Sequence, residues 1–371
     1  LNEYHDGSYF EPIYKGVKFN QYVGVIQVDG LTIEIHPKAD KYDSDAKWRG
    51  VLLEMLNVCG KINVDSTGAA NVSRQHLNLL EIYFEMYLNE INQLARLGFI
   101  KKYQKETSNL KTLKGKLEFA GNISKNLVHK ERFYTTHQIY DANHLLHQIL
   151  FSAIEIVRDF TKGTRLYDKC NRVLLNFPKV DIRQISQKHF DSIVVDRKTK
   201  PYSRALELAR LIILNYSPDI KGGNEKMLSL LFNMNDLWEE YVLIQLKRYA
   251  IKNKSNYKII GQDSKPFWKD STTHYSRYIK PDIVVQTSND TFIIDTKWKL
   301  PSNMSASIED IRQMYAYARF WNAERVMLLY PGNKQSEFEL FKNKEIDESH
   351  SCKMGFASIL KGGELTDDIG I

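Results

Sequence analysis

The sequence has 371 residues, of which 43% are hydrophobic and 26% are charged, and its 52 basic residues exceed its 45 acidic ones to give a net charge of +7. A chain of this length can form two domains with buried cores. No apolar run approaches the roughly 18 residues of a membrane-spanning helix, so we expect no contact with a membrane. The three cysteines are scattered without a CxxC pair, which excludes a zinc ribbon or a disulfide framework and indicates a cytoplasmic protein.

The N-terminal region, residues 1–217, is predicted to combine a β-hairpin with long helices. Alternating apolar residues flank Asp29-Gly30, a pair that favours a type I′ turn, and predict a hairpin over residues 22–36. Apolar residues at helical spacing predict helices over about 46–58, 74–97, 142–162 and 203–217.

A basic arm, residues 99–134, is predicted between two of these helices. From Lys101 to Arg132 it carries nine basic residues against three acidic ones, a net charge of +6. Short strand-like pieces such as GKLEFAG indicate an extended segment. The charge alone leaves three possibilities: a solvated surface, a contact with the DNA backbone, or a contact with an acidic protein surface.

Proline, paired glycines and charges in one short run predict a linker over residues 218–224, followed by a second domain over residues 225–371. The expected elements of this domain are a helix, a strand, a hairpin, a helix and a strand, over about 236–252, 257–261, 280–299, 307–322 and 325–330. The order α-β-β-β-α-β, with a helix between the last two strands, predicts a mixed α/β sheet covered by helices.

The hairpin over residues 280–299 places charges among β-branched and apolar residues. Symmetric pairing about its polar turn puts Asp282 opposite Asp295, and the alternation of side chains puts Lys297 on the same face. Facing carboxylates repel each other, and buried charge is costly unless it is paired or bound to a metal. The pattern therefore predicts either a structural ion pair or a metal site.

The residue types favour Mg²⁺ as the cofactor, because hard divalent cations prefer carboxylate and carbonyl oxygens. Asp282, Asp295 and the main-chain carbonyl of Thr296 are the expected ligands. A metal there would polarise a phosphoryl oxygen and lower the pKa of bound water, and Lys297 would stabilise the developing charge. Either Glu239 or Glu240, on the helix before the sheet, could add a further carboxylate.

Two motifs resemble the PD-(D/E)xK nuclease superfamily. Pro281-Asp282 is followed after twelve residues by Asp295-Thr296-Lys297, and the α-β-β-β-α-β order is similar to the core of that superfamily. Gln313 and Tyr317 resemble the QxxxY helix motif of RecB-type members, and at this spacing they share one helical face. The alternative for this pair is an ordinary helix edge against the core.

Segments spread over most of the chain resemble the McrC family, from about Tyr22 to Leu329. They are VGVIQVDGLTIEIHPK, LKGKLEF, YDANHLLHQIL and LFNMNDLWEEYV, in this order. The pattern in the last segment points to Glu239 as the helix acid. The arm has Lys114-Gly115-Lys116 where the family is expected to have arginines.

The resemblance implies a metal-dependent DNA endonuclease subunit of a McrBC-like restriction complex. Its implied partner, McrB, is an AAA+ GTPase that forms a hexameric ring and recognises methylated double-stranded DNA. The N-terminal half of McrC binds this ring and stimulates GTP hydrolysis, and Lys111, Lys114 and Lys116 are our candidates for that contact. Since the sequence has no GxxxxGK[ST] loop, we expect GTP on the partner and not on this chain.

Two other functions fit the same sequence. One is a self-sufficient RecB-like or resolvase-like nuclease, which would cut DNA without a partner or GTP. The other is a non-enzymatic adaptor that only binds and activates an AAA+ ring and keeps the nuclease fold as a scaffold.

Overall fold

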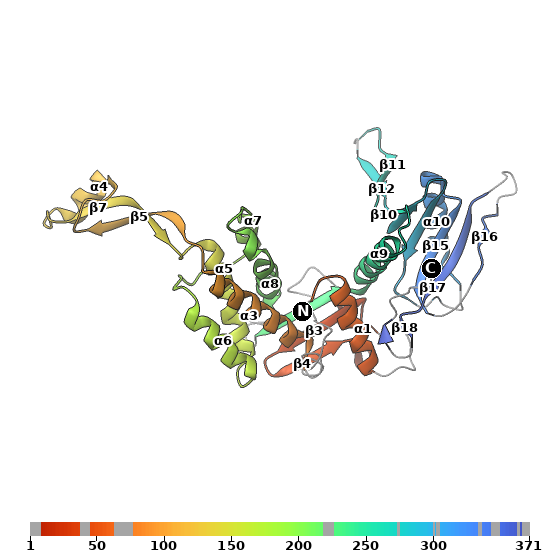
Figure 1. The fold of residues 1–371 in the computed structure, drawn as a ribbon, viewed down its shortest axis with the longest axis horizontal. Helices are drawn as coiled ribbons and strands as arrows, with labels where there is room; N and C mark the ends of the chain where they lie inside the picture. The colour runs from red at the N-terminus through yellow and green to blue at the C-terminus, as the bar shows by residue number, and fades with distance from the viewer. Residues whose placement is uncertain are drawn as a thin grey trace. The chain divides into compact units, whose positions relative to one another are not determined.

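The computed structural model describes residues 9–37, 45–62, 77–217, 226–272, 275–299, 301, 305–332, 336–342, 349–361 and 364–365, and the predicted linker 218–224 lies outside them. It confirms a mixed α/β protein with several sheets (Figure 1). Contacts group the chain into two compact units. We call them the sheet unit, Leu1–Val25, Ile33–Asn71 and Leu231–Ile371, and the helical unit, Ile26–Thr32 and Val72–Leu230.

The helical unit is built on packed helices, which are α3 (Leu79–Leu97), α5 (Leu145–Phe160), α6 (Arg165–Asn176) and α8 (Ser203–Leu214). A short helix α7 (Gln187–Asp191) and a 3-10 turn η1 (Lys200–Tyr202) precede α8. Helix α3 begins at Leu79 rather than near Arg74, because Asn78 and Glu81 form a capping box that satisfies the first free N–H groups. It ends at Leu97 with Gly98 as its C-cap, as the sequence predicts.

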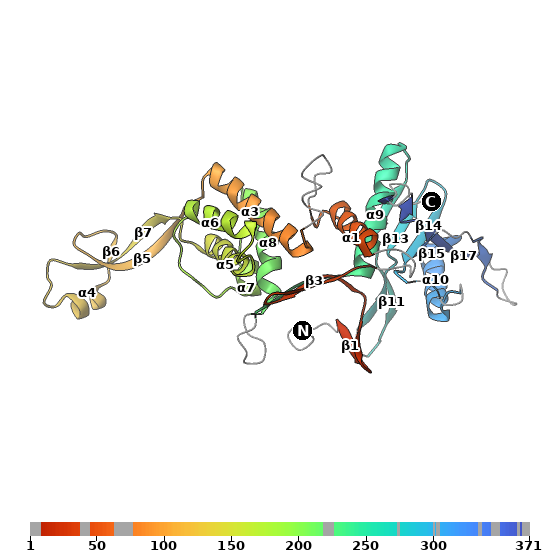
Figure 2. The same cartoon turned by 90° about the horizontal axis from the view of Figure 1, so that it is seen from below.

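The basic arm is a folded ribbon rather than a simple extended segment. Strands β5 (Lys102–Leu110) and β7 (Phe133–Asp141) pair antiparallel along their whole length, and β6 (Lys116–Leu117) joins the other side of β7. A short helix α4 (Phe119–Asn126), which the sequence pattern did not predict, packs on β7. The ribbon extends away from the packed helices of its own unit in both views (Figures 1 and 2).

A four-stranded sheet has the order β4-β3-β9-β8. Strands β3 (Tyr22–Val28) and β4 (Leu31–Ile35) are the predicted N-terminal hairpin. Strand β9 (Met227–Asn233) follows the predicted linker, yet it pairs with β3 and with β8 (Tyr216–Ser217), which precede that linker. The two units therefore differ from the predicted domains 1–217 and 225–371. The reason is that this sheet contains strands from before and after the predicted linker 218–224.

The sheet unit contains helices α1 (Asp45–Val58), α9 (Met234–Lys252) and α10 (Ile308–Trp321). Its main sheet has the order β10-β13-β14-β15-β17-β16. The strands are β10 (Lys258–Gly261), β13 (Ile283–Gln286), β14 (Thr291–Thr296), β15 (Arg325–Pro331), β16 (Glu339–Leu340) and β17 (Ser351–Ala357). Small two-stranded ribbons are β1 (Phe10–Ile13) with β2 (Gly16–Phe19), β11 (Lys265–Lys269) with β12 (Ser276–Ile279), and β18 (Leu360–Lys361) with β19 (Glu364–Leu365).

The order of α9, β10, β13, β14, α10 and β15 along the chain follows the expected helix and strand order, with the β11–β12 hairpin inserted after β10. Strands β14 and β15 are parallel, as a helical crossover requires. Helix α10 packs on β14 and β15 and closes a core of buried residues, among them Val284, Ile293, Met314 and Trp321. Among the helices that the structure describes, none combines the length and apolar character needed to cross a bilayer.

Candidate active site

The β13–β14 hairpin has the register that its symmetric turn predicts. Gln286 pairs with Thr291 and Ile283 pairs with Ile294, so Asp282 lies directly before the paired segment and Asp295 lies directly after Ile294. Asp295 is 1% exposed, while Asp282 is partly exposed. The hairpin therefore brings both aspartates to the same end of two neighbouring strands.

Thr296 connects the two strands at this end. Its backbone N–H donates to Oδ2 of Asp282 at 2.7 Å, and its hydroxyl donates to the same oxygen at 2.8 Å. Hydrogen bonds to a charged acceptor are stronger than those between neutral groups. These two bonds fix the orientation of the Asp282 carboxylate. Both are made to Oδ2, and neither involves Oδ1.

Lys297 lies among acidic and polar side chains. Its backbone N–H donates to the carbonyl of Leu329 at 2.9 Å, which holds it beside β15. Its Nζ lies 2.6 Å from Oδ2 of Asp295, 4.0 Å from Oδ1 of Asp310 and 3.5 Å from Oε1 of Gln313. The structure therefore brings Asp282, Asp295 and Lys297 into one cluster, as the hairpin register predicts.

The cluster shifts the ionisation of its members in one direction. Burial is the main reason that the pKa of the Asp295 carboxyl is raised above its ordinary value, and the charge of Asp282 raises it further against the effect of Lys297. Burial by itself would lower the pKa of the Lys297 ammonium, but Asp295, Asp282 and Asp310 outweigh it and raise that pKa. Both shifts mean that the site favours added positive charge, whether a proton or a cation.

Gln313 and Tyr317 lie on the face of α10 that meets this cluster. Gln313 Nε2 donates to the hydroxyl of Tyr317 at 2.7 Å, and that hydroxyl donates to the carbonyl of Lys280 at 2.9 Å. Tyr317 is 3% exposed and also belongs to the core of the sheet unit. The pair therefore links α10 to the chain just before Asp282, and its tyrosine ring is core as well.

Glu239 is the acid on α9 that reaches the site through hydrogen bonds. Gln262 Nε2 donates to Glu239 Oε1 at 2.8 Å, and Lys280 Nζ donates to Gln262 Oε1 at 3.0 Å. Burial, followed by the negative charge of Asp282, raises the pKa of the Glu239 carboxyl to about 7. Glu240 instead forms an ion pair with Lys61 at 3.0 Å, which gives that side chain a structural contact.

The two aspartates fit a hard divalent cation with oxygen ligands. Oδ2 of Asp295 is buried, and its charged partner is the Lys297 ammonium at 2.6 Å. Mg²⁺ is usually held by one or two carboxylates and keeps several waters. Within the described residues, no three His, Cys, Asp or Glu side chains are grouped to hold a metal. The assignment of Asp282, Asp295 and the carbonyl of Thr296 as metal ligands stays a prediction.

Sequence reasoning missed two residues of this cluster. Gln262 follows β10, and it reaches Glu239 because β10 pairs with β13 beside α9. Asp310, in the first turn of α10, accepts from Lys299 Nζ at 2.7 Å and lies close to Lys297. The position of Asp310 three residues before Gln313 was a usable signal, since residues at this spacing share a helical face.

The candidate partner residues belong to the other unit. Lys111, Lys114 and Lys116 are exposed residues of the arm, between the end of β5 and the start of β6. Gly115 between them has a φ of 74°, and a Cβ there would lie 2.4 Å from the carbonyl oxygen of Thr136. Only glycine fits this turn.

The fold and this cluster define a mixed α/β protein with two acids and a lysine at one end of two interior strands of a partly parallel sheet. The family model for the McrBC 5-methylcytosine restriction system component matches residues 17–331. The chain belongs to this family.

Two known proteins are similar to the chain. The type IV methyl-directed restriction enzyme EcoKMcrBC of Escherichia coli (strain K12) is 20% identical over 231 residues, which are 60% of this chain and 64% of that protein. A solved half-complex from a tetradecameric assembly of Thermococcus gammatolerans McrB AAA+ hexamers with bound McrC has a similar chain, with a TM-score of 0.67 and 18% identity. That match covers 97% of this chain and 83% of the other, and it shows a shared fold. Together with the family, these similarities support a McrC-like protein.

Proposed function

We propose that the chain is the Mg²⁺-dependent DNA endonuclease subunit of a McrBC-like restriction complex, with a PD-(D/E)xK core. The observation that carries this proposal is the cluster at the end of β13 and β14, where Asp295 Oδ2 lies 2.6 Å from Lys297 Nζ and Asp282 is held by Thr296. The order of α9, β10, β13, β14, α10 and β15 supports the same assignment.

Each residue of the cluster has a distinct part in phosphodiester hydrolysis. Asp282, Asp295 and the carbonyl of Thr296 would hold Mg²⁺, which would supply Lewis-acid polarisation of the scissile phosphate. Lys297 places its ammonium where negative charge develops, and the surrounding carboxylates keep it protonated. Glu239, with its raised pKa, is suited to accept or release a proton near neutral pH.

The test is DNA cleavage by three variants of the full chain in the presence of its partner ring. Asp282→Asn, Asp295→Asn and Lys297→Met should each lower the cleavage rate by about a hundredfold or more. The matched control is Asp290→Asn in the exposed turn of the same hairpin, which should cut at the wild-type rate. Calorimetry should show weaker Mg²⁺ binding by the two aspartate variants. A wild-type cleavage rate in any of the three variants contradicts the assignment.

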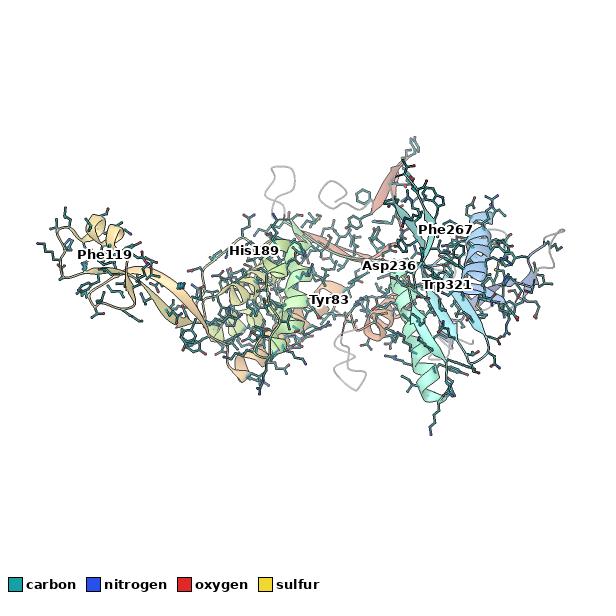
Figure 3. All side chains as sticks on the ribbon, turned by 90° about the horizontal axis from the view of Figure 1, so that it is seen from above. Tyr83, Phe119, His189, Asp236, Phe267 and Trp321 are labelled. Atoms are coloured by element: carbon teal, nitrogen blue, oxygen red, sulfur yellow. The ribbon has the colours of Figure 1, made fainter. Side chains whose placement is uncertain are left out.

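The arm supports an AAA+ ring as the partner. Its tip combines the three exposed lysines with large apolar side chains that are 60–84% exposed, namely Leu113, Phe119, Ile123, Leu127 and Val128. Phe119 marks this tip in Figure 3. Exposed apolar groups clustered beside charges are typical of a protein interaction site. We propose that this tip binds a McrB-like hexamer, which would bind GTP and recognise methylated double-stranded DNA.

A further inference from the structure

The β11–β12 hairpin is a two-stranded ribbon with an unusual surface. It is inserted between β10 and β13, and its strands pair only with each other in the described structure. Four aromatic side chains on it are 48–63% exposed, namely Phe267, Trp268, Tyr275 and Tyr278. Burial of such rings is favourable, so their exposure indicates a binding surface rather than a core.

The same hairpin is rich in positive charge. Between Lys265 and Lys280 the sequence has four basic residues and one acidic residue, Asp270. Trp268 pairs across the strands with Arg277, so the two side chains share a face of the ribbon. The guanidinium of Arg277 also lies 4.8 Å from the centre of the Tyr275 ring. Interleaved rings and cations are typical of surfaces that bind nucleic acid.

The base of the hairpin is fixed on the end of α10. Lys265 Nζ donates to the carbonyl of Phe320 at 2.9 Å and lies 4.6 Å from the centre of a Trp321 ring. The rings of Phe267 and Phe320 are 5.3 Å apart, and Figure 3 shows Phe267 and Trp321 in the same part of the sheet unit. Phe267 and Lys265 therefore anchor the ribbon, which leaves Trp268, Tyr278, Lys269 and Arg277 without such a role.

Both ends of the hairpin connect to the acidic cluster. Before β11, the backbone N–H of Gln262 donates to the carbonyl of Asp282 at 2.8 Å, and its side chain bonds to Glu239. After β12, the carbonyl of Lys280 accepts from the hydroxyl of Tyr317. The ribbon thus begins and ends at residues that contact the site, so a ligand bound at its base would lie beside that site.

We propose that the β11–β12 hairpin binds DNA next to the phosphodiester bond that is cut. Lys269 and Arg277 contact phosphates, and Trp268 or Tyr278 stacks on a base exposed at that point. This inference rests on the proposed nuclease function and assigns the residues that position its substrate. The exposed side chains of the ribbon are aromatic and cationic rather than aliphatic, which fits a polyanion with flat bases better than an apolar protein surface.

The test measures DNA binding by the full chain without Mg²⁺, so that no cleavage is needed. The probe is duplex DNA with a mismatch beside 2-aminopurine, whose fluorescence changes when an aromatic ring stacks on it. The double variant Trp268→Ala, Tyr278→Ala should lose this fluorescence change. Its affinity for the DNA should fall by at least about fivefold. The double variant Lys269→Ala, Arg277→Ala should reduce the salt slope of binding by about 1.8, since each phosphate contact contributes about 0.9.

Matched controls come from the exposed part of α9. Tyr249→Ala is the aromatic control and Lys247→Ala with Lys252→Ala is the charge control, and both should bind as the wild type does. Wild-type affinity, salt slope and fluorescence in the hairpin variants would overturn the proposal, as would a wild-type chain that binds no DNA. If the hairpin variants lose binding while Asp295→Asn still cuts, the nuclease site is misassigned and the DNA contact stands.

Discussion

Thr296 donates two hydrogen bonds, one from its backbone and one from its hydroxyl, to a single carboxylate oxygen of Asp282. Asp282 directly precedes β13 and Thr296 is the last residue of the neighbouring strand β14, between Asp295 and Lys297 in the sequence. Thr296, the middle residue of the D-T-K motif, therefore orients Asp282, while its neighbours supply the second carboxylate and the ammonium of the cluster. Its side chain has a positioning role in addition to the carbonyl that we assign to the metal.

Replacing Thr296 by valine tests this positioning role. The variant keeps the backbone bond to Asp282 and the buried shape but loses the hydroxyl bond. Partners that orient metal ligands typically contribute 10-fold to 100-fold to metal affinity or activity, so we expect the Mg²⁺ concentration for half-maximal cleavage to rise by about tenfold. Added Mg²⁺ should restore much of the rate. The control is Thr291→Val at the other end of β14, which should not change the Mg²⁺ dependence.

Glu239→Gln should change how stability depends on pH. The Glu239 carboxyl has its pKa raised to about 7 from an ordinary 4.5. Between these values the folded protein keeps a proton that the unfolded chain releases, so the wild type loses stability as pH rises from about 4.5 to about 7. Glutamine removes this contribution, and the variant should gain stability relative to the wild type at pH 8 but not at pH 4. Urea denaturation of both proteins in the presence of a metal chelator measures their free energies of unfolding. An equal difference between variant and wild type at pH 4 and pH 8 would contradict the prediction.

Tyr317→Phe should separate the hydrogen bonds of this residue from its role in the core. The ring stays, but the carbonyl of Lys280 loses its donor and Gln313 loses its acceptor. Such a loss costs about 1–2 kcal/mol of unfolding free energy. We also expect a fall in cleavage rate at saturating Mg²⁺, because the chain before Asp282 is less firmly held. A stable variant with an unchanged rate would show that Tyr317 is a core residue alone.

The arm should be essential for stimulating the partner. Changing Lys111, Lys114 and Lys116 to glutamate reverses the charge of the arm's tip and should abolish the stimulation of GTP hydrolysis by a McrB-like ring. The chain's own DNA binding should change little, because the DNA-binding hairpin that we propose is on a different unit. GTP turnover and size-exclusion chromatography of the mixture measure both steps.

The control for the arm places the same charge changes elsewhere on the helical unit. Lys179, Lys188 and Lys198 are exposed and lie outside the arm. Their change to glutamate should leave ring assembly and GTP hydrolysis at the wild-type level. Full stimulation by the arm variant would show that another surface binds the ring.

The register of the β13–β14 hairpin could be predicted from the sequence because it is a local property. A polar turn between two β-branched runs fixes the pairing, and the alternation of side chains then places Asp282, Asp295 and Lys297 together. The spacing of Gln313 and Tyr317 on one helical face could be predicted for the same reason. These features depend on neighbours that are close in the chain.

The features that the sequence did not predict depend on distant contacts. Gln262 reaches Glu239 only after β10 has paired with β13. Strand β9 could not be joined to β3 from its own pattern, because nothing local specifies which strand it pairs with. Helix α4 is short, and its place on β7 depends on Asn122, which accepts from the backbone N–H of Tyr134. Tertiary contacts of this kind override weak local preferences.

The pairing of β3 with β9 has a consequence for how the protein is made. Asp29 and Lys226, at the ends of these strands, are hydrogen-bonded although they are 197 residues apart in sequence. A ribosome adding about 5–20 residues per second needs about 10–40 s to cover this separation. For that time the β3 edge of the β3–β4 hairpin is open and can pair with other chains. Nascent chains that stall before Met227 should therefore be the aggregation-prone species of this protein.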